Sequence, residues 1–187
     1  MGWRDDVSDA VYLALCAVFR MNPESKESMK RFVPAYMSNT TNAQAPRNMD
    51  ICYYAISEMQ DSGFDYIQLE NVLVNDVPKV RLKKTIPVEV LITFYGDGAD
   101  DESEKFWSEF QWDSGENSAR ALLRKKNMTT IGKPGVGRPV SLFETEGTFH
   151  RRRCDVRLYL AYLYITESEG EYVDNPPEFV IDETENN

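Results

Sequence analysis

The feature that most constrains this chain is a run of alternating apolar and polar residues between positions 79 and 95. The even positions of this run are apolar apart from Lys84, namely Val80, Leu82, Ile86, Val88, Val90, Ile92 and Phe94. A period of two places successive side chains on opposite faces of a strand. The run therefore predicts a long antiparallel strand with one buried face and one solvated face.

The sequence changes its period directly after this strand. Gly96 and Gly98 end the strand, because glycine adopts backbone angles that other residues avoid. An amphipathic helix over 99–110 is then predicted by one apolar stripe, made of Ala99, Ser103, Phe106, Trp107 and Phe110. Its first turns carry Asp100, Asp101, Glu102 and Glu104, which favour the positive end of the helix dipole. We expect Trp107 to be a core residue between this helix and the long strand.

A second helix is predicted near the N-terminus, with Asp5 or Ser8 as its N-cap and Pro23 at its end. One face is apolar through Val7, Ala10, Val11, Ala14, Leu15 and Val18, and the other through Tyr12, Leu13, Cys16 and Phe19. A helix that is apolar on both faces is either central in the core or shared with a neighbouring subunit. We favour burial within the domain.

The remaining patterns predict short elements. Candidate strands cover residues 31–37, 51–56, 66–74, 140–143 and 148–164, and a short helix begins near Ala119. The strands at 51–56 and 66–74 and the long strand follow one another closely, which predicts an antiparallel meander. The expected fold class is α+β, with a mostly antiparallel sheet of about five strands. The N-terminal helix and two helices between strands pack on it, in a single domain over residues 1–165.

Composition excludes several classes of protein. The chain has 187 residues, 42% of them hydrophobic, which is enough for one domain with a sizeable core. A formal charge of −10 argues against a protein that grips nucleic acid, although DNA can still pass beside an acidic surface. Cys16, Cys52 and Cys154 are widely spaced and odd in number, which indicates reduced, buried thiols.

We expect no targeting or membrane segment. Asp5 and Asp6 stand where a secretory signal would carry basic residues, and Asp6 also fails the myristoylation pattern. The apolar run over residues 11–19 is far shorter than the roughly 20 residues that span a bilayer.

The C-terminal segment differs from the rest of the chain. From Thr166 onward it contains eight carboxylates and no Lys or Arg, namely Glu167, Glu169, Glu171, Asp174, Glu178, Asp182, Glu183 and Glu185. We therefore predict a mobile acidic tail over residues 166–187. Within it, Pro176 and Pro177 precede Phe179, Val180 and Ile181. Prolines lower the entropy lost on docking, so this segment can add a strand to the sheet of another subunit or partner.

No motif predicts a catalytic, cofactor or metal site, and we expect a protein that is not an enzyme. The loop from Gly132 to Gly137 lacks the order of a phosphate loop and is interpreted as a surface hairpin. The acidic residues 97–104 do not follow the calcium-loop spacing, and helix capping explains them. His150 is the single histidine, and no nucleophile turn accompanies it.

Arg151, Arg152 and Arg153 form the densest cationic group in the sequence. Such a group either defends an edge strand by charge or pairs with carboxylates on another protein. Trp3, Trp107 and Trp112 are interpreted as core or core-rim residues, not as platforms for a ligand.

Three features together carry a resemblance to a known family. They are the strand end Phe94-Tyr95-Gly96-Asp97-Gly98-Ala99, the amphipathic helix followed by a short basic helix, and the strand Arg153-x-Asp155-Val156-x-Leu158. In these features the chain resembles the neck and tail-terminator proteins of tailed bacteriophages, which complete the tail and join it to the head. The resemblance covers about residues 50–164, and the N-terminal helix by its order.

The resemblance implies a structural virion protein, made in the cytoplasm of the host bacterium and located at the phage neck. Six copies would form a ring that ends the tail tube and lets DNA pass without specific binding. Implied partners are the chain itself, the tail tube protein, the head–tail connector and the tail sheath, with no cofactor. Interface candidates are Arg120, Arg124, Arg151, Arg152, Arg153, Phe179, Val180 and Ile181.

Two alternatives stay open. The chain could be a small adaptor or regulatory module without catalytic activity, which binds one partner through the edge of its long strand. It could also be an enzyme that holds a metal through the acidic residues at 97–104.

Overall fold

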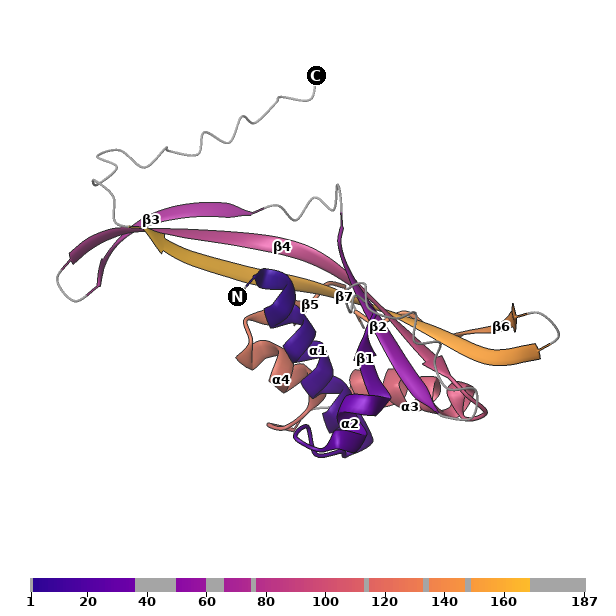
Figure 1. The fold of residues 1–187 in the computed structure, drawn as a ribbon. Helices are drawn as coiled ribbons and strands as arrows, with labels where there is room; N and C mark the ends of the chain where they lie inside the picture. The colour runs from indigo at the N-terminus through magenta and orange to yellow at the C-terminus, as the bar shows by residue number, and fades with distance from the viewer. Residues whose placement is uncertain are drawn as a thin grey trace, which may run out of the picture.

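The fold was analysed in a computed structural model, which describes residues 2–35, 50–59, 66–74, 77–112, 115–132, 135–146 and 149–168 (Figure 1). Four helices and seven strands follow in the order α1 (Trp3–Phe19), α2 (Lys26–Arg31), β1 (Phe32–Pro34), β2 (Ile51–Glu58), β3 (Ile67–Val74), β4 (Val77–Tyr95), α3 (Ala99–Trp112), α4 (Ala119–Lys125), β5 (Met128–Thr130), β6 (Val140–Glu146) and β7 (Phe149–Ser168). The predicted α+β class is confirmed. Within the described residues the sheet is mixed and has seven strands, where about five mostly antiparallel strands were expected.

Two long strands form the centre of the sheet. β4 and β7 pair antiparallel from Val80 opposite Ser168 to Tyr95 opposite Arg153. β3 and β2 lie end to end along the other edge of β4, whereas β6 and β5 lie along the other edge of β7. β1 adds the parallel pairing, with Phe32 opposite Cys52. Apart from β1, every other described strand thus pairs directly with β4 or β7.

The predicted meander is wrong, because β2 and β3 do not pair with each other. Glu58 lies opposite Val88 and Ile67 lies opposite Lys84, so both strands pair with β4. β4 has 19 residues, which leaves room along one edge for two strands of 8 residues each. The length of the central strand therefore decides the topology.

All four helices lie on one side of the sheet, here called the inner face (Figure 1). The even residues of β4 and β7, from Ile86 to Phe94 and from Cys154 to Tyr162, point to that side and are buried. These strand residues pack with Val7, Val11 and Leu15 of α1 and with Phe106 and Phe110 of α3, and all five helix residues are at most 1% exposed. This layer is the hydrophobic core.

Burial within the domain accounts for the apolar surface of α1. Seven of its residues are buried, including Cys16, and Tyr12 and Phe19 also pack against the core. The N-cap is Gly2, not Asp5 or Ser8, and the Asp5 side chain accepts a hydrogen bond of 3.0 Å from the Gly2 N–H. The two predicted caps stand inside the first turns of the helix instead.

The turn and helix after β4 follow the predicted pattern. Gly96 has φ +117°, and a Cβ there would lie 2.1 Å from Asp50 Oδ1, so only glycine fits without a shift. α3 then buries Phe106 and Phe110 completely. Trp107 is only partly buried and packs against the edge of the core, with Arg138 Cζ 5.8 Å from its ring. Its predicted place in the core is therefore corrected to the core rim.

The loop between β5 and β6 is not simply a surface hairpin. Val136 is 4% exposed and forms a single bridge with Leu158 of β7. Gly135 has φ +79°, and a Cβ there would lie 2.5 Å from Thr130 Cβ. This part of the loop continues the row of strands along β7.

The sheet is longer than the helical layer that covers it, and two arms project beyond that layer (Figure 1). We call them the β3 arm, made of β3 with residues 77–84 of β4 and 163–168 of β7, and the β6 arm, made of β6 with residues 149–155 of β7. β7 continues through Ser168, so residues 166–168 of the predicted tail are strand. Residues 169–187 and the predicted loop at 38–47 lie outside the described residues.

Candidate assembly surfaces

The β3 arm has two contrasting faces. On the outer face, away from the helices, Arg81 lies 3.3 Å from Glu70 and 2.8 Å from Glu167, and Lys83 lies 2.8 Å from Glu70. The hydrogen bond from Lys83, with help from Arg81, lowers the pKa of Glu70. These ion pairs join β3, β4 and β7 across the arm.

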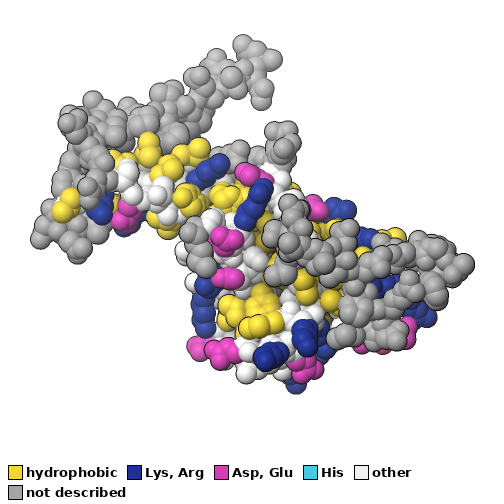
Figure 2. Space-filling view, viewed as in Figure 1, with side chains coloured by type: hydrophobic (Ala, Val, Ile, Leu, Met, Phe, Trp, Pro, Cys, Tyr) yellow, Lys and Arg dark blue, Asp and Glu magenta, His cyan; other side chains and the backbone are white. Residues whose placement is uncertain are grey.

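The inner face of the same arm carries exposed apolar side chains and extends past the helices. Ile67 is 50% exposed and Leu69 is 44% exposed, and both point to the side that the helices cover elsewhere. Figure 2 shows hydrophobic side chains gathered on this arm. Exposed apolar groups on a projecting sheet indicate a contact surface for another protein.

The β6 arm exposes apolar side chains on both faces. Val140 and Leu142, 54% and 41% exposed, lie opposite Asp155 and Arg153 and therefore point to the outer face. Phe143 is 72% exposed and points to the inner face. Among the described residues, β6 pairs with β7 alone, so its other edge is open. An open, apolar strand edge is a template for another strand.

The structure divides the three consecutive arginines between the two faces. Arg151 and Arg153 lie on the outer face, with their Cζ atoms 4.4 and 5.9 Å from the centre of the Tyr95 ring. Arg153 also donates two hydrogen bonds of 2.8 Å to Asp155. The interpretation of an edge strand defended by charge is wrong for Arg153, where β7 pairs with β4 on one side and β6 on the other. The pairing with β4 ends there, and at Arg151 and Arg152 β7 pairs as a strand with β6 alone.

Of the three arginines, Arg152 alone lies on the inner face. Its side chain is 55% exposed, and Nη1 lies 4.0 Å from Oδ2 of Asp100 at the start of α3. The other oxygen of Asp100 accepts a hydrogen bond of 2.7 Å from Ser141 of β6. Of the three arginines, Arg152 is therefore the one most open to a carboxylate from outside the chain.

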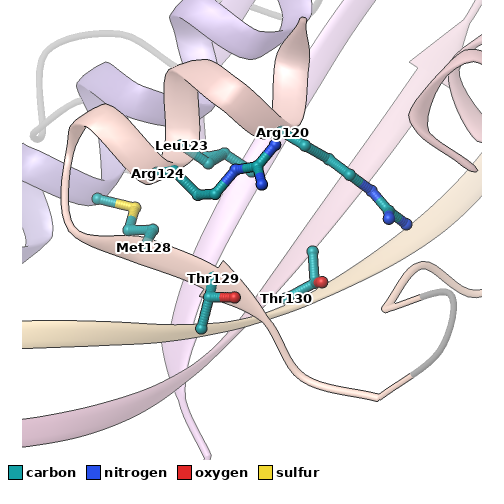
Figure 3. Close-up of a pocket in the computed structure, with 6 residues that line it drawn as sticks. All are labelled: Arg120, Leu123, Arg124, Met128, Thr129 and Thr130. Atoms are coloured by element: carbon teal, nitrogen blue, oxygen red, sulfur yellow. The ribbon is translucent and has the colours of Figure 1, made fainter. Parts of the chain in front are cut away.

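Arg120 and Arg124 belong to a different region. Both lie on α4 and line a cavity of about 70 Å³ together with Leu123, Met128, Thr129 and Thr130. Figure 3 shows the Arg120 side chain extending away from that of Arg124, and Arg120 Cζ lies 5.2 Å from the Phe110 ring centre. A cavity of this size has room for about two waters.

The two arginine groups do not form one site. α4 leads into β5, which pairs with residues 160–162 of β7, whereas Arg151–153 belong to the stretch that pairs with β6. The predicted interface residues Phe179, Val180 and Ile181 lie outside the described residues. Sequence reasoning missed the exposed apolar residues of both arms.

The acidic start of α3 is used within the fold. Glu102 forms an ion pair with Arg31 of α2, and Asp100 accepts the hydrogen bond from Ser141. Burial raises the pKa of Glu102 in spite of Arg31. Among the residues that the structure describes, no three His, Cys, Asp or Glu side chains are grouped as metal ligands.

The three thiols are free and buried, as predicted. Burial raises the pKa of Cys16, Cys52 and Cys154, which disfavours the reactive thiolate. No helix in the described ranges is both long enough and apolar enough to span a membrane.

A scan of protein-family models and a search of curated proteins found no match to this chain.

Proposed function

We propose that this chain is a structural protein of a phage neck, of which six copies form a ring that ends the tail tube and joins it to the head connector. The resemblance in residues 94–99 and 153–158 supplies the family. The observation that carries the proposal is the pair of arms at opposite ends of β4 and β7, each with exposed apolar side chains.

Two different surfaces on one chain favour a contact that is repeated head to tail. When one patch of a subunit meets another patch of the next subunit, the contact closes into a ring if the rotation closes. The β3 arm and the β6 arm are such a pair, because they project from opposite ends of the same two strands. Leu69 of the β3 arm is 44% exposed, and Leu142 of the β6 arm is 41% exposed.

Charge supports a passage role for the ring. The chain carries a formal charge of −10, and an acidic lumen repels DNA phosphates and lets the genome slide through. The proposed partners are the chain itself, the tail tube protein, the connector and the sheath. No catalytic role is part of the proposal.

The adaptor alternative is favoured by one observation. The open edge of β6 can accept one extended segment of a partner without any ring. An adaptor would stay a single chain and form a one-to-one complex.

Sedimentation of the full chain, alone and with tail tube and connector proteins, separates the two functions. The ring proposal expects a six-copy species in at least one of these mixtures. Leu142→Asp should reduce that species, whereas Trp112→Asp, at an exposed position at the C-terminal end of α3, is the control. A single-chain species in every mixture overturns the proposal.

A further inference from the structure

We propose that the C-terminal segment 178–182 of one copy adds as a strand to the open edge of β6 in the next copy. This inference rests on the proposed self-assembly and names the contact that links neighbouring copies. It places Phe179 and Ile181 beside Val140 and Leu142, and it places the flanking carboxylates on the face of Arg152.

The open edge of β6 can accept one more strand. Within the described part of the chain, β6 uses only the edge that faces β7 for pairing. Val140 and Leu142 point to the outer face and Phe143 to the inner face, and all three are at least 41% exposed. A strand added here would satisfy the open backbone groups of β6 and cover these side chains.

The alternation of the segment matches the alternation of that edge. In an extended strand Phe179 and Ile181 share one face, while Glu178, Val180 and Asp182 share the other. If the apolar pair lies on the outer face with Val140 and Leu142, the second set lies on the inner face. Val180 then falls on the side of Phe143. This match holds for parallel and for antiparallel addition.

The charges of the segment and of Arg152 favour the same arrangement of the added strand. Residues 169–187 contain seven of the 31 carboxylates of the chain and none of its 21 Lys and Arg residues, so they need cations from elsewhere. Arg152 lies opposite Phe143 on the inner face and is 55% exposed. Glu178 and Asp182 reach that same face. A guanidinium binds a carboxylate with paired hydrogen bonds, which favours this contact.

The distance along β7 disfavours the same chain as donor. Leu142 lies opposite Arg153, and continuous strand runs from residue 153 to Ser168, which is about 50 Å at about 3.3 Å per residue. Residues 169–179 span at most about 40 Å when fully extended. Phe179 therefore falls short of Leu142 of its own chain, which favours a second copy as the donor of the segment.

Disulfide cross-linking between two variants of the full chain tests the contact. One variant carries Leu142→Cys, and the other carries Phe179→Cys or Ile181→Cys; the three native thiols are buried. After mixing under a mild oxidant, a linked dimer is expected with one of the two tail variants. Ile165→Cys, 42% exposed on the other arm, is the matched control for Leu142→Cys, and it should give no linked dimer.

Each outcome decides one of the two claims. A six-copy species without the Leu142 link overturns the tail contact and leaves the ring. The Leu142 link in an assembly of another size supports the tail contact and overturns the six-fold ring. Equal linking to Ile165→Cys, or linking within a diluted single chain that carries both cysteines, also overturns the tail contact.

A charge exchange tests the role of Arg152 separately. Arg152→Glu should reduce the Leu142 link, and Asp182→Arg or Glu178→Arg in the partner chain should restore it. A synthetic peptide of residues 169–187 should compete for the link, whereas a scrambled peptide of the same composition should not. Equal competition by both peptides would show attraction by charge alone and would overturn the strand addition.

Discussion

The hydroxyl of Tyr162 in β7 donates a hydrogen bond of 2.8 Å to Oδ2 of Asp6 in the first turns of α1. Two residues further along the same face, Tyr164 is only partly buried, and beyond it Leu69 of the β3 arm is 44% exposed, with none of the described helices over it. The Tyr162–Asp6 contact therefore lies where the covered sheet ends and the exposed arm begins.

This contact predicts a specific sensitivity to alkali. Burial, together with Asp6, raises the pKa of Tyr162 from 10.0 to about 12. Because the folded state holds this proton more tightly than the unfolded state, the resulting stability is present below pH 10 and is lost as the pH rises toward 12. Burial gives Tyr12 a similar shift, to about 12.

Tyr162→Phe should therefore lose less stability than the wild type between pH 8 and pH 11. Part of the loss should remain, because the pKa of Tyr12 is still raised in this variant. Removal of the hydrogen bond should cost about 1–2 kcal/mol at pH 8. Urea unfolding midpoints at the two pH values measure both effects. Equal pH dependence in the two proteins would contradict the role of Tyr162.

Adjacent aromatic residues on α3 should differ in their effect on stability. Phe106 is 0% exposed, and Phe106→Ala should cost about 3–5 kcal/mol through lost burial and a cavity. Trp107 lies at the core rim, so Trp107→Ala should cost clearly less. Thermal or urea unfolding of the two variants gives the comparison. A greater loss in Trp107→Ala would return this side chain to the core.

The periodic patterns of single elements predicted those elements well. The alternation over 80–94 and the stripe over 99–110 correspond to β4 and α3, because one-sided burial leaves its period in the sequence. The pairing of β2 and β3 with the same edge of β4 was not predictable in this way. A strand's own pattern gives its buried face, but not its neighbour.

The arms could have been inferred from length alone. A 19-residue strand is about 63 Å long at about 3.3 Å per residue, whereas a compact chain of this size has a diameter of about 40 Å. Strands such as β4 and β7 must therefore project. Strand alternation would likewise have separated Arg152 from Arg151 and Arg153. The exposed apolar residues at 140, 142 and 143 depend on which edge stays open, and this is a tertiary property.

Charge reversal should affect the three arginines differently. Arg153 binds Asp155, and Arg151 stacks on Tyr95, so reversal at these two positions should disturb contacts within the chain. Arg152→Glu should instead weaken assembly with little change in the unfolding midpoint, and the effect should shrink at high salt. Sedimentation at two salt concentrations measures this. Unchanged assembly in Arg152→Glu would remove Arg152 from the interface.

Apolar contacts at the β6 arm should matter for assembly and not for folding. Phe143 is 72% exposed in the single chain, so Phe143→Asp should leave the unfolding midpoint almost unchanged and reduce the six-copy species. Met29→Asp, at a 57% exposed position on α2, is the control and should assemble normally. Similar assembly of the two variants would show that the β6 arm is not an interface.

The central claim is a six-fold ring, and electron microscopy of the full chain together with the measured particle mass tests it most directly. The chain mass is 21.5 kDa, and the expected particle has six times that mass and six-fold symmetric end views, either alone or bound to tail tubes. A particle with the mass of one chain in both conditions, and no ring at the end of the tubes, would contradict the claim.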